Sequence, residues 1–269
     1  MRTTKRPIGV FLFLGPTGVG KTETAKALAQ VYFGSESSIV RLDMSEFQEE
    51  EAINRLIGPP PGESGFASGG QLTEAVRKNP FSLVLLDEIE KAHQKVQEAF
   101  LAIFDEGRVA DASGRLISFT NTIIIATSNA GAEFIREEIS SGRGIGQIKP
   151  ALLEKLQREG IFKPEFLNRF DDVVVYKPLE KTDVDAVTRL MLKDLESRLS
   201  HQDINVSLTP AAIGYLSTKG FDQTYGARSL RRVIADEVED LISKKILSGE
   251  IKRGSSANID AQNGSLVIS

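Results

Sequence analysis

Short apolar runs alternate with longer amphipathic segments along the first two thirds of the chain. The apolar runs at residues 10–14, 38–42, 81–86, 122–126 and 172–176 predict strands. Strands that are apolar throughout are typical of a parallel sheet that is covered on both faces. Apolar residues at helical spacing predict intervening helices over residues 22–33, 95–106, 151–159 and 164–169. The order of strand and helix predicts an α/β fold.

Other segments between these elements carry turn and loop patterns. Ser45 and Gln48 predict a capping box for a helix toward Ile57, and residues 107–119 predict a short hairpin that turns at Ser113-Gly114. Residues 58–70 hold three consecutive prolines and five glycines, which predicts an exposed loop. Residues 142–149 predict a second, flexible loop.

Beyond Pro178 the pattern changes to helices with few strand features. Helices are predicted over residues 182–200, 210–217 and 227–247. This change predicts two domains, a large α/β nucleotide-binding domain over residues 1–178 and a small, mainly helical domain over residues 179–269.

The composition excludes several classes of protein. The 269 residues are 41% hydrophobic and 26% charged, and they include no cysteine and no apolar run long enough to cross a bilayer. We therefore expect a cytoplasmic protein without disulfides, membrane contact or thiolate metal sites. A net charge of −4 argues against broad nucleic-acid binding. Met1 stands only a few residues before the first strand, which indicates an excised fragment.

A phosphate-binding loop follows the first predicted strand and precedes the first predicted helix. Its glycines allow positive φ angles, so that backbone N–H groups can surround phosphate oxygens at a helix N-terminus. Lys21 is expected to reach the β and γ phosphates, and the Thr22 hydroxyl to ligate Mg²⁺. The residues predicted to bind ATP are Gly15, Pro16, Thr17, Gly18, Val19, Gly20, Lys21 and Thr22.

Two acids end the strand predicted at residues 81–86. Asp87 and Glu88 are expected at its carboxyl end, beside the phosphate loop of a neighbouring strand. Asp87 is predicted to hold the Mg²⁺ shell, and Glu88 to orient and polarise the attacking water. The alternative is a solvated helix start, since acids favour that position.

Asn129 follows the strand predicted at residues 122–126. Its amide could contact the γ-phosphate or the lytic water. It could equally cap the following helix, and the spacing alone leaves both interpretations open.

Five ordered motifs resemble the second ATPase module of the Clp AAA+ unfoldases. They cover nearly the whole chain: the phosphate loop, the run from Leu85 to His93, Thr-Ser-Asn-Ala-Gly at 127–131, Phe-Leu-Asn-Arg-Phe-Asp at 166–171 and Tyr-Gly-Ala-Arg at 225–228. The resemblance implies an ATPase that forms a homo-hexameric ring, uses ATP and Mg²⁺, and acts on unfolded or misfolded proteins. In that family an N-terminal domain and a first ATPase module precede this one.

The resemblance also implies roles for three further residues. Asn129 matches the first sensor, Arg169 the arginine finger that enters a neighbouring subunit's site, and Arg228 the second sensor. Without the resemblance, both arginines would be interpreted as ordinary surface residues.

Two segments depart from the family pattern. The family's pore loop usually reads Gly-Tyr-Val-Gly, and the matching residues here are Gly62-Glu63-Ser64-Gly65. Glu63 therefore replaces the gripping aromatic with a charge, Ser64 follows it, and the nearby Phe66 is an alternative gripping residue. The peptidase-docking tripeptide reads Ile145-Gly146-Gln147, and the polar Gln147 makes a partner peptidase uncertain.

The leading hypothesis is therefore an ATP-hydrolysing module of a ring that remodels or threads polypeptides. The alternative is a nucleotide-gated assembly module that has lost threading together with the pore aromatic. A DNA-directed AAA+ ATPase is disfavoured by the acidic charge balance.

Overall fold

A computed structural model describes residues 5–60, 62, 69–222 and 226–268. The chain forms two compact units. Residues 1–15 and 20–177 make up the first unit, and residues 16–19 and 178–269 make up the second. Among the described residues, no helix is both long enough and apolar enough to cross a membrane.

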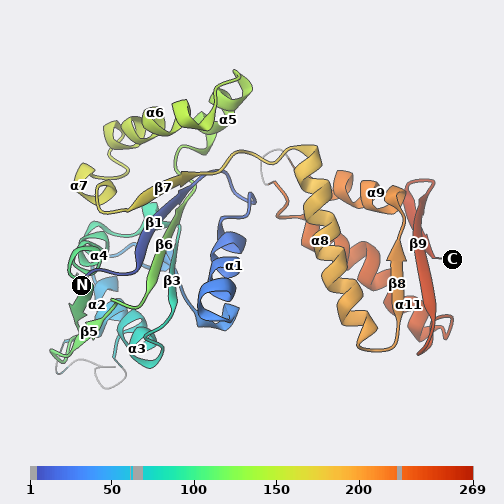
Figure 1. Cartoon of the computed structure of the whole chain (residues 1–269), viewed down its shortest axis with the longest axis horizontal. Helices are drawn as coiled ribbons and strands as arrows, with labels where there is room; N and C mark the ends of the chain where they lie inside the picture. Colours follow the sequence, from blue (N-terminus) through green and yellow to red (C-terminus); the bar gives the residue numbers. More distant parts are fainter. Residues whose placement is uncertain (1–4, 61, 63–68, 223–225, 269) are drawn as a thin grey trace. The chain divides into compact units, whose positions relative to one another are not determined.

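A five-stranded parallel sheet forms the centre of the first unit (Figure 1). The strand order is β2-β3-β6-β1-β7. The strands are β1 (Gly9–Leu14), β2 (Ile39–Asp43), β3 (Leu83–Asp87), β6 (Ile123–Ser128) and β7 (Asp172–Val175). All five lie within two residues of the predicted runs, because each is built on a short, mainly apolar segment; β2 is interrupted only by Arg41.

The order of the strands corrects one expectation. The sequence analysis placed Asp87 beside the phosphate loop of a neighbouring strand, but β6 lies between β1 and β3. Strand order depends on the crossovers, which no local pattern encodes.

Within the described residues of this unit, seven α-helices connect or flank these strands. They are α1 (Lys21–Phe33), α2 (Ala52–Ile57), α3 (Gln71–Lys78), α4 (Gln94–Glu106), α5 (Ala132–Ser140), α6 (Ile145–Arg158) and α7 (Pro164–Leu167). The predicted hairpin is present as β4 (Arg108–Ala110) and β5 (Leu116–Ser118), which pair antiparallel.

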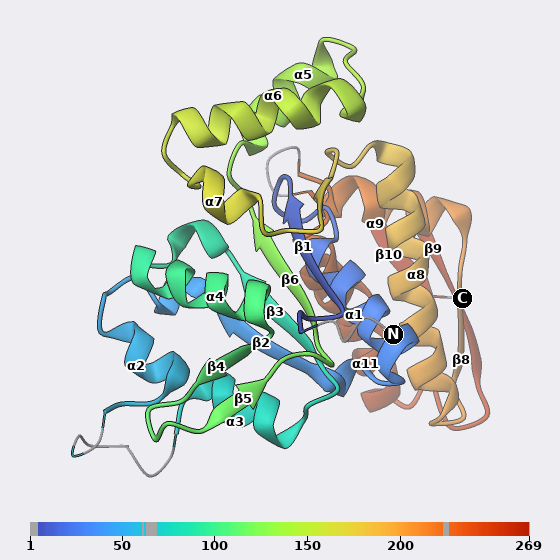
Figure 2. The ribbon, with the colours of Figure 1, turned by 60° about the vertical axis from the view of Figure 1, so that its left-hand side comes forward.

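Alternate residues of the strands point to opposite faces of the sheet, so the unit has two apolar layers. On one face Phe13, Leu85 and Ile125 pack with Ala25 and Ala29 of α1. On the other face Leu12, Val84 and Ile124 belong to a larger cluster, to which α2, α4, α6 and α7 contribute. Figure 2 shows α1 and α4 on opposite sides of the sheet.

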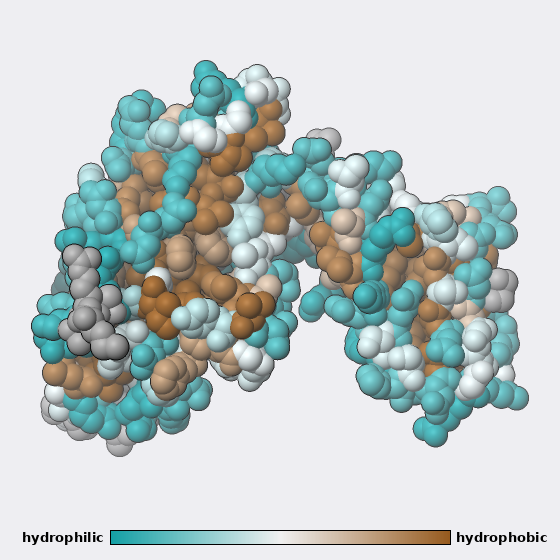
Figure 3. All heavy atoms as spheres, viewed as in Figure 1, coloured by the Kyte–Doolittle hydropathy of each residue, from teal (hydrophilic) through white to brown (hydrophobic). Residues whose placement is uncertain are grey.

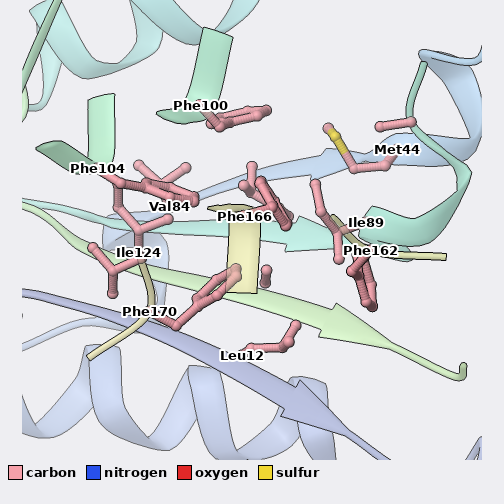
Figure 4. Close-up of a cluster of buried hydrophobic side chains, with 14 of the residues drawn as sticks. Leu12, Met44, Val84, Ile89, Phe100, Phe104, Ile124, Phe162, Phe166 and Phe170 are labelled. Carbon is pink, nitrogen blue, oxygen red and sulfur yellow. The ribbon is translucent and has the colours of Figure 1, made fainter. Parts of the chain in front are cut away.

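Aromatic rings dominate the larger layer (Figure 4). Phe104 lies 5.9 Å from Phe166 and 5.4 Å from Phe170, measured between ring centroids. Phe166 and Phe170 meet edge to face at 5.3 Å. This cluster connects α4 to α7 and to the turn after it, which carries Arg169.

The second unit combines helices with a small sheet. Its helices are α8 (Lys181–Ser200), α9 (Pro210–Gly220), α10 (Leu230–Ile234) and α11 (Asp240–Leu247), and Ala235–Glu239 form a π-helical turn between the last two. Strands β8 (Asn205–Leu208), β9 (Ser256–Gln262) and β10 (Ser265–Ile268) form a sheet in the order β10-β9-β8. The α/β unit followed by a smaller helix-rich unit agrees with the predicted fold class.

Three local predictions are wrong. Ser45 caps no helix, because Gln48 donates to the carbonyl of Ser45 and Asp43 accepts from its amide. The predicted loop at residues 142–149 ends at Gly144, where α6 begins. The strands of the second unit escaped detection because β8 and β10 have only four residues each, and β9 holds a single large apolar residue, Ile259.

Candidate functional site

The carboxyl ends of β1, β3 and β6 carry the chemical groups of the first unit. Gly15 follows β1 with a φ of 155°, Gly18 has a φ of 76° and Gly20 a φ of 99°. A residue with a side chain rarely adopts these φ angles, which explains the glycines of the predicted phosphate loop. Gly20 is the N-cap of α1, so the free N–H groups of the first helical turn lie next to the loop.

Lys21, the first residue of α1, is only 8% exposed. Its ammonium donates to the carbonyl of Gly15 at 2.6 Å and to Oδ1 of Asn129 at 2.8 Å. Burial lowers the pKa of Lys21 to about 8, although three carboxylates oppose this shift: in decreasing order, Glu90, Asp87 and Glu88. The cation is thus held at the start of the helix by groups at the ends of two strands.

Asp87 is the last residue of β3 and is buried. Its Oδ2 accepts from Arg41 of β2 at 2.6 and 3.1 Å, and its Oδ1 accepts from the Thr127 hydroxyl at 2.5 Å. For Asp87 this buried, hydrogen-bonded strand end excludes the solvated helix start of the alternative interpretation. Glu88, in contrast, is the N-cap of the 3₁₀ turn Ile89–Lys91, and its side chain is 30% exposed. The sequence analysis missed Arg41, whose only indication was a charge within an otherwise apolar strand.

Glu88 follows directly with a φ of 57° and a ψ of 51°, a conformation that few residues other than glycine adopt. Its carboxylate pairs with Lys91 and accepts from the Asn129 amide at 3.3 Å. Strained residues of this kind concentrate at active sites.

Asn129 follows β6 and connects the other groups. Its side chain accepts from Lys21 and donates to Glu88, so one amide spans the phosphate-loop lysine and the glutamate. It does not cap α5, because Gly131 is the N-cap there and no side chain caps that helix. The capping interpretation is therefore wrong.

The remaining predicted residues lie elsewhere. Arg169 is exposed in the turn after α7, where its Nε pairs with Asp105 at 2.9 Å. Arg228 belongs to the second unit and is exposed in the turn before α10. Glu63, Ser64 and Phe66 lie outside the described residues.

The oxygen donors suit a magnesium ion that arrives with a nucleotide. Thr22 and Asp87 provide the hydroxyl and the carboxylate, and no cluster of three or more metal-ligating side chains occurs in the described part of the chain. Mg²⁺ is usually bound by one or two carboxylates together with substrate phosphates, so few protein ligands are expected.

The parallel sheet, the glycine loop after β1 and the two acids at the end of β3 define a P-loop nucleoside triphosphatase. A family model described as "AAA domain (Cdc48 subfamily)" matches residues 6–173. A second, described as "C-terminal, D2-small domain, of ClpB protein", matches residues 179–259.

Named relatives agree with these family models. The chain is 48% identical over 270 residues to the chaperone protein ClpB of Clostridium perfringens, covering 100% of this chain and 31% of that protein. It is 48% identical over 254 residues to ClpB of Meiothermus ruber, covering 94% and 30%. With ClpB of Rhodopirellula baltica it shares 45% over 269 residues, covering 100% and 30%. The chain spans about three tenths of the length of these relatives.

The chain belongs to the AAA ATPases, as the C-terminal ATPase module of a Clp-family protein.

Proposed function

We propose that this chain is the ATP-hydrolysing module of a ring-forming chaperone that remodels misfolded polypeptides, as the name of its relatives suggests. The observation that carries the proposal is the hydrogen-bonded series from Lys21 through Asn129 to Glu88. It joins a phosphate-binding cation, a polar amide and a carboxylate at the ends of β1, β6 and β3.

In this proposal the phosphate loop binds ATP through its backbone N–H groups, and Lys21 contacts the β and γ phosphates. Thr22 and Asp87 would hold Mg²⁺, which would neutralise charge on the phosphates. The negative phosphates attract Lys21, so the contact with Asn129 rearranges when the nucleotide binds.

Glu88 then acts on water. It accepts a proton as the water oxygen forms a bond to the γ phosphorus. The bond from that phosphorus to the bridging oxygen breaks, and ADP leaves with the electron pair. Asn129 holds the γ-phosphate or the water so that the water lies in line with the bond that breaks. Asn129 positions the reacting atoms and forms no covalent bond itself.

Arg169 is proposed to complete the site of a neighbouring copy. Its side chain is exposed, and the buried rings of Phe166 and Phe170 hold the turn that carries it. Both features support an arginine that reaches a neighbouring copy. Arg228 is proposed to contact nucleotide from the second unit. Hydrophobic side chains also reach the surface of the first unit (Figure 3). Val31, Tyr32 and Phe81 are among the exposed ones.

A pair of variants tests the proposal. Glu88→Gln removes the proton acceptor with little change in shape, so ATP binding should persist while turnover falls about a hundredfold or more. Lys21→Ala should instead abolish binding, because it removes the phosphate contact. Glu106→Gln, at a site with a 63% exposed side chain, is the control. Normal turnover in Glu88→Gln would refute the assignment.

A further inference from the structure

Glu90 is the second acid after β3, and none of the roles above uses it. It lies in a 3₁₀ helix of one turn, Ile89–Lys91. The fully buried Ile89 anchors this turn in the aromatic layer (Figure 4). Gln97 of α4 donates to the carbonyls of Ile89 at 3.4 Å and Ala92 at 3.1 Å. The backbone that carries Glu90 is therefore fixed from both sides.

The side chain of Glu90 reaches across to the end of β6. Its Oε1 accepts from the backbone amide of Asn129 at 3.0 Å. This bond joins residues 39 positions apart, at the point where the chain leaves the sheet. The Asn129 side chain begins at the same Cα atom, so the bond restrains the origin of the amide that spans Lys21 and Glu88.

The second carboxylate oxygen has an unusual environment. Oε2 of Glu90 is buried and has no hydrogen-bond partner within the described ranges. Glu90 also lines a cavity of about 520 Å³ together with Asn129 and Ala130. A buried carboxylate oxygen without a partner is unfavourable. The bond to the Asn129 amide uses only Oε1, so that bond alone does not explain why a carboxylate stands here.

We infer that Glu90 is a positioning residue for ATP hydrolysis, which fixes the backbone of Asn129 and thereby aims its side chain at the reacting groups. The inference rests on the proposed function, because it assumes that Asn129 takes part in hydrolysis. An anionic acceptor makes a stronger bond to a backbone N–H than a neutral one does, which suits a group that must not move.

The first test separates the hydrogen bond from the rest of the side chain. Glu90→Ala removes the acceptor, and kcat should fall about tenfold to a hundredfold, as expected when a reacting group is displaced by about an ångström. Affinity for a fluorescent ATP analogue should stay close to that of the unmodified chain. Glu90→Gln keeps an acceptor oxygen at the same reach and should recover most of kcat. Glu106→Ala, at an exposed position, is the control.

A double-mutant cycle with Asn129→Ala identifies the route of the effect. If Glu90 acts through Asn129, adding Glu90→Ala to Asn129→Ala should cause no further loss of kcat. Independent, multiplying losses would overturn the inference, as would equal losses in Glu90→Gln and Glu90→Ala. Should Glu90→Ala fail to fold, Glu90→Asp, whose shorter side chain withdraws the acceptor, takes its place.

The cycle also distinguishes the two proposals. A normal kcat in Glu90→Ala beside a reduced kcat in Asn129→Ala would refute the role of Glu90 alone. A normal kcat in Asn129→Ala would refute the role proposed for Asn129, and with it the premise of this inference.

Discussion

Lys21 is buried, and its burial lowers the pKa of its ammonium group. Its pKa of about 8 lies below the ordinary value of 10.5, because burial penalises the charged form. Between these two values the unfolded chain binds more protons than the folded chain. The lysine's contribution to the free energy of unfolding therefore rises with pH through this window, as the unfavourable burial of charge is relieved.

Nucleotide binding should reverse this titration. Phosphate favours the ammonium form, so ATP that binds near pH 9 should draw about one proton from solution onto Lys21. Calorimetry in two buffers of different ionisation enthalpy measures this uptake. Binding of ATP without proton uptake would show that Lys21 is already charged at that pH and would contradict its lowered pKa.

Glu88 combines a functional side chain with an unfavourable backbone. A left-handed conformation costs a residue with a Cβ atom about 1–2 kcal/mol, and glycine avoids this cost. We expect Glu88→Gly to be about 1 kcal/mol more stable than Glu88→Ala, with both variants inactive. Urea unfolding provides the comparison. A less stable glycine variant would mean that the strain is relieved in solution.

The residues of the site differ in how far the sequence identifies them. Lys21, Asp87, Glu88 and Asn129 follow apolar strands, and the strand-end rule is enough to bring them together. Glu90 was missed because an acid in a turn is indistinguishable from a solvated one until its partner across the sheet is known.

Among the elements, α7 is short but firmly packed. Its Phe166 is 2% exposed and contacts the rings of Phe104, Phe162 and Phe170. Phe166→Ala should lower the free energy of unfolding by about 3–5 kcal/mol, because it removes the ring and leaves a cavity. Phe81→Ala, at a position 64% exposed, should change it by less than about 0.5 kcal/mol. Equal effects would show that the ring cluster is not a major source of stability.

Element boundaries also show what local patterns cannot decide. Three glycines between residues 142 and 146 predicted a loop, yet Gly146 lies inside α6, where Ile145 and Ile148 pack against the core. Tertiary packing overrode the weak helix propensity of glycine. Gln147 is consequently an exposed residue in the first turn of a helix, which gives no support to a peptidase-docking loop.

At the scale of the whole molecule, the two units have separate apolar cores. The predicted site residues are divided between them, with Arg228 in the second unit and the strand-end groups in the first. Arg169 belongs to the first unit but is proposed to serve another copy. In the proposed function, hydrolysis is therefore a property of the assembly rather than of one chain.

Mixing two inactive variants tests this dependence most directly. Lys21→Ala has a disabled nucleotide site and an intact Arg169, whereas Arg169→Ala has an intact site and no arginine to offer. Neither should hydrolyse ATP alone. Their mixture should recover hydrolysis, with a rate per subunit that rises with protein concentration, because Arg169 from one chain completes the site of the other. A mixture that stays inactive while the unmodified chain hydrolyses ATP, or full activity of Arg169→Ala by itself, would contradict a site shared between subunits.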